Sequence, residues 1–439
     1  MNQILKLGQT VQVEPGNRSC RVDDFLGGGG QGEVYRATLD GKTVALKWYF
    51  PASATNEQRE NLKTLIGKGA PNDRFLWPQA LATARGVQGF GYVMGLRPPQ
   101  YKGIVDMMKR RIEPSFRALA TACYLISESF YALHTKGMCY RDISFGNVFF
   151  DPKTGDVLVA DNDNVTISGQ AAGGVLGTPR FMAPEVVRGE AKPDTYTDLY
   201  SLAVLLFYML MVHHPLEGRQ ELAIKCLDLP AMNKLYGTDP LFIFDPQDHS
   251  NAPVPGEHDN ALAFWPLYPQ FVRDLFIKSF TVGLKEPHDR VTESVWRQAM
   301  IHLRDSIFYC AKCGSENFYD AEALRASGGQ PGTCWSCGSQ LRLPYRILLN
   351  KVVVMLNHDT QLYPHHIDDQ RLYDFSQPVA QVTQHPTNPS LWGLKNLTQA
   401  SWTLTTSEGT VSDVPPGRNA PLASGSRINF GKVEGEVRY

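Results

Sequence analysis

Glycines and a lysine near the N-terminus have the spacing of a phosphate-binding element. Gly27, Gly29 and Gly32 stand in the segment LGGGGQGEVY, which also contains Val34. Glycine has no side chain, so backbone N–H groups can approach an anion closely at such a turn. Lys47 ends the apolar segment VALK that follows. The pattern predicts a hairpin that covers nucleotide phosphates beside a strand lysine; the alternative is a flexible hairpin that binds nothing.

A second group of polar residues has the composition of a magnesium site with a proton acceptor. Asp142 and Asn147 stand five positions apart in RDISFGN, after a segment with helical periodicity. Asp161 follows the strand-like segment VLVA. Mg²⁺ prefers oxygen ligands. Asn147 and Asp161 could therefore hold Mg²⁺ while Asp142 accepts the proton of an incoming hydroxyl.

The eight cysteines fall into two groups. One group forms two CxxCG sequences separated by twenty residues, namely Cys310, Cys313, Cys334 and Cys337. Four thiolates in two such pairs predict a structural Zn²⁺ site in a zinc ribbon. A redox pair is the alternative, but it needs only one CxxC and no βαβ pattern surrounds it. The other four, expected to be buried thiols, are Cys20, Cys123, Cys139 and Cys226.

Composition narrows the class of protein further. The 439 residues include 43 Lys and Arg against 44 Asp and Glu, so the chain offers no excess of positive charge for a nucleic acid or an anionic membrane. The first residues lack the pattern of a targeting signal. The longest uncharged apolar stretch, residues 199–212, is too short to span a bilayer. We therefore expect a cytoplasmic protein of about three domains with reduced thiols.

Several kinds of element must position these residues. Residues 1–100 alternate in the manner of short strands around one helical segment at 56–65. Helical periodicity marks residues 114–134 and, after short turns, residues 201–211, 271–280 and 292–304. Residues 239–266 are rich in Pro, Asp, Asn and His, which predicts an irregular surface insertion. From residue 345 onward, β-like segments separated by turn residues predict an all-β domain.

Taken in order, these motifs resemble the catalytic domain of a Ser/Thr protein kinase. Three further matches are GTPRFMAPE at residues 177–185, Asp198 in TDLYSLAVLLF and Arg290 in EPHDRVT. The resemblance runs from about residue 25 to residue 304. It implies an α+β bilobal kinase fold over residues 1–304, with the small lobe ending at about 97, the large lobe spanning 98–304 and the insertion at 239–266. A zinc ribbon at 305–343 and a β-sandwich at 344–439 would follow.

The resemblance also assigns roles to residues near the nucleotide. The three glycines would cover the phosphates of ATP, and Lys47 would hold the α and β phosphates. Glu60, on the helix after Lys47, would be the ion-pair partner of the lysine, with Glu57 as the alternative. Met94 occupies the gatekeeper position, and the backbone from Gly95 to Arg97 would contact adenine.

Other roles implied by the resemblance concern the catalytic loop and the activation segment. Asp198 would anchor the catalytic loop, and Arg290 would pair with Glu185. Thr178 would orient Asp142. Arg141 would meet a phosphorylated activation segment, for which the candidate acceptors are Thr166 and Ser168.

Two departures from the kinase pattern bear on activity. Ser144 replaces the usual catalytic-loop lysine, and loss of that charge predicts a slower enzyme or a cation supplied from elsewhere. Asp161-Asn162-Asp163 replaces Asp-Phe-Gly, which predicts a less mobile metal loop and a further carboxylate, that of Asp163, near Mg²⁺. The alternative is a pseudokinase scaffold that binds ATP without transferring phosphate. Transfer to small molecules is disfavoured by the GTPRFMAPE segment.

The C-terminal region resembles the second half of a forkhead-associated domain, mainly over residues 391–430. The Gly-Arg and Ser-x-x-His pairs that grip phosphothreonine in that family are missing, so we expect a docking module in which Arg418 and Arg427 are the candidate anion contacts. The domain order and the Asp-Asn-Asp loop resemble bacterial tellurite-resistance-associated TerY-phosphorylation kinases. That resemblance implies a von Willebrand A-domain protein as substrate and a metal-dependent protein phosphatase as antagonist.

Overall fold

The computed structural model describes residues 3–16, 18–168 and 177–439, and the chain divides into two compact units. The first consists of Met1–Trp265 and Asp274–Arg297, and the second of Pro266–Arg273 and Gln298–Tyr439. Within the described residues, no helix has both the length and the hydropathy needed to cross a bilayer.

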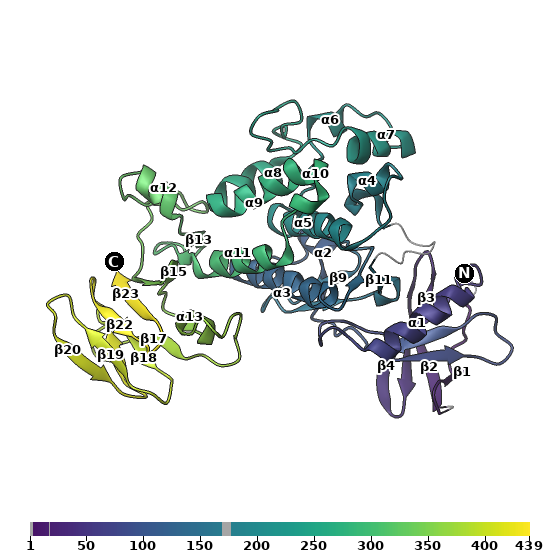
Figure 1. Ribbon diagram of the computed structural model, residues 1–439, viewed down its shortest axis with the longest axis horizontal. Helices are drawn as coiled ribbons and strands as arrows, with labels where there is room; N and C mark the ends of the chain where they lie inside the picture. Colours follow the sequence, from purple (N-terminus) through teal and green to yellow (C-terminus); the bar gives the residue numbers. More distant parts are fainter. Residues whose placement is uncertain (1–2, 17, 169–176) are drawn as a thin grey trace. The chain divides into compact units, whose positions relative to one another are not determined.

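The first unit begins with a small lobe, drawn in purple and dark blue in Figure 1, in which six strands close into a barrel of order β1-β2-β3-β4-β6-β5. Strands β3 and β4 pair so closely that a Cβ at Gly32 would lie 2.1 Å from the carbonyl oxygen of Trp48, which is why this position requires glycine. Thr55 caps the helix of this lobe by accepting a hydrogen bond from the Gln58 backbone. The elements are β1 (Thr10–Val13), β2 (Arg18–Gly28), β3 (Gly32–Leu39), β4 (Lys42–Tyr49), α1 (Asn56–Lys68), β5 (Ala80–Thr83) and β6 (Gly91–Met94).

The larger lobe of the first unit is mainly helical. Its central helix α5 is buried on nearly all sides, as its continuous apolar sequence predicts. The elements up to the activation segment are β7 (Lys102–Gly103), α2 (Ile104–Met108), α3 (Phe116–His134), β8 (Met138–Cys139), β9 (Val148–Phe150), β10 (Val157–Val159), η1 (Asn162–Asn164) and β11 (Thr166–Ile167). Those from residue 177 onward are η2 (Pro179–Phe181), α4 (Pro184–Val187), α5 (Thr195–Met211), α6 (Arg219–Leu222), α7 (Leu229–Asn233), η3 (Lys234–Thr238), α8 (Asp259–Phe264), η4 (Trp265–Leu267), α9 (Gln270–Phe280), α10 (Val282–Lys285), η5 (Pro287–Asp289) and α11 (Glu293–Asp305). Of these, η4, α9 and α11 include residues that belong to the second unit.

Residues 239–258 are irregular, as predicted, but the prediction that this segment is a surface insertion rather than packed structure is wrong. The ring of Phe242 is fully buried and lies 5.8 Å from that of Phe207 and 5.3 Å from that of Phe280. Asn251 is also fully buried, and its side chain donates to the carbonyl oxygens of Leu216 and Leu241. Isolated aromatic side chains thus pack the segment against the helices, and polar side chains form hydrogen bonds with its irregular backbone. Neither kind of residue recurs at a regular spacing, so the sequence pattern does not reveal the packing.

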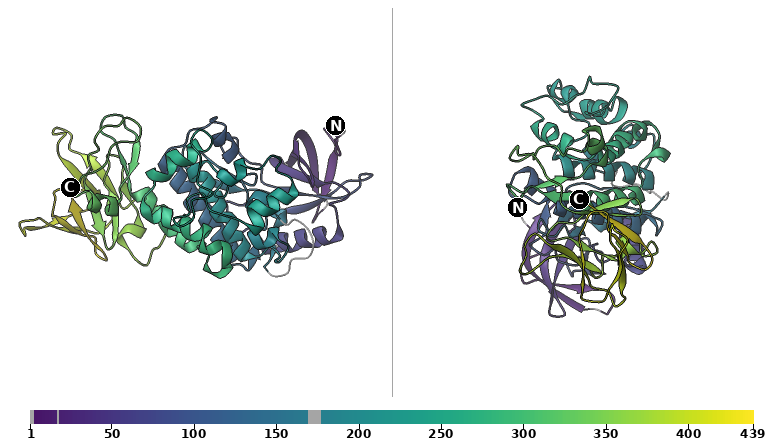
Figure 2. Two further views of the ribbon diagram at one scale, coloured as in Figure 1. Left: turned by 90° about the horizontal axis from the view of Figure 1, so that it is seen from above. Right: turned by 90° about the vertical axis from the view of Figure 1, so that its left-hand side faces the viewer.

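The second unit contains a cysteine-bearing region and a β-sandwich, whose strands are drawn in light green to yellow in Figure 2. The sandwich has sheets of order β15-β14-β23-β22-β19-β20 and β16-β17-β18-β21 around a core that includes Trp402 and Phe430. This confirms that the C-terminal region is rich in β-strands, although it also contains a short helix at residues 364–367. The elements are β12 (Ile307–Tyr309), β13 (Glu316–Phe318), α12 (Ala321–Ala326), β14 (Arg346–Leu349), β15 (Val352–Met355), β16 (Gln361–Leu362), α13 (Pro364–Ile367), β17 (Ala380–Gln384), β18 (Trp392–Asn396), β19 (Trp402–Thr405), β20 (Val411–Val414), β21 (Asn419–Pro421), β22 (Arg427–Asn429) and β23 (Glu434–Arg438).

Candidate active site

A cavity of about 270 Å³ brings together residues that are far apart in the sequence. It combines the glycine-rich turn between β2 and β3, the lysine of β4 and polar side chains of the larger lobe. The lining residues are Gly29, Gly30, Gln31, Gly32, Val34, Lys47, Asp142, Asp161 and Asn164. The structure therefore gathers the predicted phosphate-binding, metal-binding and proton-accepting groups around one space.

The remaining residues predicted to contact nucleotide, Gly27, Met94, Gly95 and Arg97, are not among those that line this cavity. Gly27 is on β2, opposite Val34. Met94 ends β6, is buried and pairs in register with Ala45 of β4. Gly95 and Arg97 follow in the segment that leads to the larger lobe, where the Arg97 guanidinium lies 3.9 Å from the centre of the Phe149 ring. Burial lowers the pKa of Arg97.

Asp142 is held by two polar neighbours. Thr178 Oγ1 donates to its Oδ1 at 2.7 Å, as predicted, and Asn147 Nδ2 donates to its Oδ2 at 3.1 Å. Asn147 Nδ2 also donates to the backbone oxygen of Asp142 at 2.8 Å, so its amide oxygen is the atom left for a metal. Burial raises the pKa of Asp142, which makes the carboxylate a better proton acceptor.

Asp198 of α5 anchors the catalytic loop, as the sequence predicted. Its carboxylate accepts hydrogen bonds from the backbone nitrogens of Tyr140 and Arg141 at 2.5 and 2.9 Å. Arg141 has a φ of +72°, a conformation that costs a non-glycine residue free energy and persists only where its surroundings enforce it. The buried carboxylate of Asp198 supplies part of that enforcement.

A histidine that sequence reasoning missed completes this anchor. His134, at the end of α3, lies between two carboxylates: Nε2 is 3.0 Å from Asp198, and Nδ1 contacts Glu293 of α11. Burial by itself would lower the pKa of His134, but hydrogen bonds to Asp198 and Glu293 raise it to about 9. No periodic or motif signal marks this residue, because its partners come from two distant helices.

The raised pKa of His134 predicts that stability depends on pH. The imidazolium form is favoured in the folded state, so its contribution is complete below the ordinary pKa of 6.5 and is lost as pH rises through about 9. We expect the free energy of unfolding to fall by on the order of 3 kcal/mol between these limits. Urea unfolding at pH 6.5 and 9.5 measures this difference. A His134→Gln variant should lack it; an equal loss in that variant would contradict the assignment.

The metal loop, Asp161-Asn162-Asp163, has a constrained backbone and a polar side chain at its buried middle position. Asp161 has a φ of +49° and lines the cavity. Burial raises the pKa of Asp161. Asn162 is fully buried, and its amide donates at 2.9 Å to the carbonyl oxygens of Leu76 and Val159. Asn162 thus stands where the kinase pattern has a phenylalanine, and its side-chain amide is hydrogen-bonded to the backbone instead of packing as an apolar ring.

The structure does not form the predicted ion pair between Lys47 and Glu60. Glu60 Oε1 lies 2.7 Å from Lys63 Nζ, and the Glu60 side chain is 68% exposed. Lys47 Nζ instead lies 2.9 Å from Asp163 Oδ2 and 3.5 Å from Asp161 Oδ1. The carboxylate of Asp163, expected near Mg²⁺, is therefore engaged with the lysine.

The candidate phosphate acceptors lie at the start of the activation segment. Thr166 begins β11 and lines a second cavity, of about 580 Å³, together with Arg141. Ser168 donates its backbone N–H to the Gly137 carbonyl at 3.0 Å. At the far end of the segment, Arg290 forms two 2.8 Å hydrogen bonds with Glu185, as predicted.

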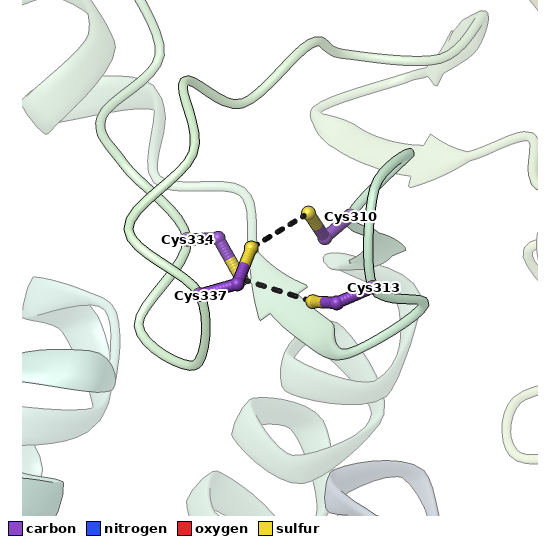
Figure 3. Close-up of side chains that lie close together, drawn as sticks. All are labelled: Cys310, Cys313, Cys334 and Cys337. Carbon is purple, nitrogen blue, oxygen red and sulfur yellow. Dashed lines mark hydrogen bonds between the residues drawn. The ribbon is translucent and has the colours of Figure 1, made fainter.

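Two identical turns bring the four clustered cysteines together (Figure 3). Cys310 Sγ lies 3.8 Å from Cys337 Sγ, and Cys313 Sγ lies 3.7 Å from Cys334 Sγ. A tetrahedron of sulfurs about 2.3 Å from Zn²⁺ has edges of about 3.8 Å, so this arrangement fits the ion. The N–H of Gly314 bonds the Cys310 carbonyl, that of Gly338 bonds the Cys334 carbonyl, and both glycines have positive φ.

The other cysteines are placed mainly as expected. Cys20, Cys123 and Cys139 are buried, but Cys226 is exposed, which contradicts the prediction of a buried thiol. Cys226 follows the short helix α6 in a segment where Leu222, Leu227 and Leu229 are exposed as well.

Comparison with known proteins shows similarity to protein kinases. Residues 94–292 match the family model of the protein kinase domain. The serine/threonine-protein kinase PknK of Mycobacterium bovis is 30% identical over 203 residues, which cover 44% of this chain and 18% of that protein. The DNA damage-responsive serine/threonine-protein kinase RqkA of Deinococcus radiodurans is 28% identical over 223 residues, covering 46% and 31%. The human serine/threonine-protein kinase WNK4 is 28% identical over 225 residues, covering 49% and 18%.

Residues 94–292 are therefore similar to a protein kinase domain, and the relatives that match the chain are Ser/Thr protein kinases. The match covers less than a third of the length of each of these relatives. The family-model match, at residues 94–292, includes neither the cysteine cluster nor the sandwich.

Proposed function

We propose that this protein is an active Ser/Thr protein kinase that transfers the γ-phosphate of ATP to protein hydroxyls. The observation that carries the proposal is the cavity that joins the glycine-rich turn, Lys47, Asp142 and Asp161. Motifs alone could survive in a scaffold that has lost its chemistry. A proton acceptor, a phosphate-binding lysine and a metal-binding carboxylate around one space support the complete reaction.

Different residues of the chain bind the phosphates, accept the proton and hold the metal in the proposed reaction. The backbone around Gly29 and Gly32 covers the phosphates, and Lys47 places positive charge beside them. Asp142, oriented by Thr178, accepts the proton of the attacking hydroxyl. The oxygens of Asn147 and Asp161 are suited to hold Mg²⁺, which when bound neutralises negative charge on the phosphates.

Ser144 is the feature that favours a slow enzyme. It is buried, and its Oγ accepts a hydrogen bond from the Gly146 N–H at 3.3 Å. A neutral hydroxyl thus stands where a kinase of this class would place a charge that stabilises the transferring phosphoryl group. The proposal is compatible with this if Lys47 and Mg²⁺ supply most of the positive charge.

Incubation of the purified chain with Mg-ATP and a general protein substrate tests the proposal, with phosphosites read by mass spectrometry. We expect phosphoserine or phosphothreonine that disappears with EDTA and in the Asp161→Asn variant. If ATP raises the melting temperature but no protein gains phosphate, the chain is an ATP-binding scaffold. Phosphate found only on small molecules would also contradict the proposal.

We assign the cysteine cluster to a structural zinc ribbon and the sandwich to a forkhead-associated-like docking module. The sulfur spacing supports the first assignment, and the resemblance over residues 391–430 supports the second. The order of these domains supports the TerY-phosphorylation type, with a von Willebrand A-domain protein as substrate and a metal-dependent phosphatase as antagonist. Adding such an A-domain protein to the phosphorylation assay tests the partner, since it should be modified faster than the general substrate.

A further inference from the structure

The lysine of the nucleotide site is paired within a cluster that the kinase resemblance did not predict. Lys47 Nζ donates to both carboxylate oxygens of Asp163, at 3.1 Å to Oδ1 and 2.9 Å to Oδ2. Lys47 is 5% exposed and Asp163 is fully buried. A pair so shielded from water interacts strongly, and either charge left alone there would be costly.

Two tyrosines of the barrel donate hydrogen bonds to the carboxylate of Asp163. Tyr92 Oη donates to Asp163 Oδ1 at 3.0 Å, and Tyr49 Oη donates to Oδ2. Tyr49 lies two residues after Lys47 on β4, so both side chains project from the same face of the sheet. Tyr92 of β6 is opposite Lys47 in the strand register. Three neighbouring positions of one sheet face thus converge on a single aspartate.

Helix α1 contributes neutral amides where the resemblance implied a glutamate. Gln58 Nε2 donates to Tyr49 Oη at 3.0 Å and to the Asp163 carbonyl at 3.1 Å. Asn61 Nδ2 donates to the carbonyl oxygens of Asp163 and Val165 at 3.3 and 3.1 Å. The helix therefore holds the backbone of the metal loop, while the loop itself supplies the charge that holds Lys47.

We propose that Asp163 is the positioning residue for Lys47, in place of a glutamate on α1. Resting on the proposed kinase function, this means that the metal loop carries both a metal ligand, Asp161, and the carboxylate that orients the phosphate-binding lysine. Residues 161–163 then fix the position of the Lys47 ammonium relative to the bound metal. A shift of α1 would weaken amide hydrogen bonds but would leave the ion pair intact.

Steady-state kinetics of phosphoryl transfer separate this assignment from the one implied by the resemblance. Asp163→Asn should lower kcat/KM for ATP by about 100-fold, because a displaced lysine no longer meets the phosphates. Glu60→Gln, the matched loss of a carboxylate on α1, should remain within about twofold of the unmodified protein. Asp163→Gly combined with Gln58→Glu moves the carboxylate to the helix and should recover part of the loss. Full activity in Asp163→Asn, or its loss in Glu60→Gln, would overturn the proposal.

Unfolding by urea tests the pair without any need for activity. Asp163→Asn leaves the buried Lys47 with only its longer contact to Asp161, and Lys47→Met leaves the buried carboxylate of Asp163 without its cation, whereas the double variant removes both charges of the pair. We expect the double variant to be more stable than the sum of the single losses predicts, even if Asp163→Asn alone unfolds. The matched cycle of Lys47→Met with Glu60→Gln should be additive. Additive losses in the first cycle would overturn the pairing.

The two experiments also separate this proposal from the proposed function. If the unmodified protein transfers no phosphate but the first cycle shows coupling, the kinase proposal fails and Asp163 retains the lysine pair as a structural feature only. If the unmodified protein is active and Asp163→Asn is equally active, the kinase proposal stands and the positioning role fails.

Discussion

Replacement of Asp142 by Asn should lower kcat for protein phosphorylation by about 10²–10⁴-fold, the range contributed by a positioned proton acceptor. Asparagine keeps an oxygen that can accept from Thr178 but has no basic group for the substrate hydroxyl. Its amide nitrogen would also face Asn147 Nδ2, which now donates to Oδ2 at 3.1 Å, so one hydrogen bond is lost. The nucleotide site itself is unchanged, and ATP should still raise the melting temperature.

Single-turnover kinetics and thermal unfolding with ATP measure these two effects separately. Thr178→Val provides a matched control, because it removes the group that orients Asp142 but keeps the carboxylate. We expect a smaller decrease in kcat for that variant. A protein with Asp142→Asn that phosphorylates at the normal rate would show that another group accepts the proton. A loss of ATP binding would show that the substitution disturbed the site as a whole.

Loss of one sulfur ligand should unfold the cysteine-bearing region of the second unit. Structural Zn²⁺ in small domains contributes an apparent binding free energy of about 10 kcal/mol or more to folding at neutral pH. The hydrophobic cluster around Cys310 and Cys334 is small, including Phe308, Leu341 and Met355, and offers little to replace it. We expect one zinc ion per chain in the unmodified protein, and we expect Cys334→Ser to lower that zinc content and to remove hydrogen-exchange protection between residues 307 and 343.

Elemental analysis and hydrogen exchange of the full chain test this prediction, with Cys226→Ser as the control for loss of an exposed thiol. That control should keep both its zinc and its protection. A strong chelator should reproduce the effect of Cys334→Ser on the unmodified protein. Undiminished protection after complete removal of zinc would show that the region folds without the ion.

Much of the active site could be predicted from sequence because its parts are local. The glycine-rich turn, Asp142 with Asn147, and the two CxxCG turns each place their residues within a few positions, where backbone geometry alone brings them close. The order of these motifs predicted the kinase fold and also the long-range contacts of Thr178 with Asp142 and of Arg290 with Glu185.

The partner of Lys47 could not be predicted from the sequence, because it depends on which elements pack together in the folded protein. From the sequence, Glu60 was the predicted partner of Lys47 and Glu57 the alternative, and both lie on the predicted helix α1. The structure selects Asp163 because Tyr49 and Tyr92 donate to that carboxylate inside the barrel, whereas Glu60 faces solvent and Lys63. Side-chain burial of this kind depends on strand register and packing, which local patterns do not specify.

By itself, then, the sequence predicted a kinase-like catalytic domain, most of the residues that line its cavity and the four cysteines that cluster. Only the tertiary structure decided the partner of Lys47, the buried position of His134 between Asp198 and Glu293, and the packing of Phe242. The physical reason is sequence separation. Groups brought together by a turn are visible as a motif, whereas groups brought together by the folding of distant elements become partners only in the assembled core.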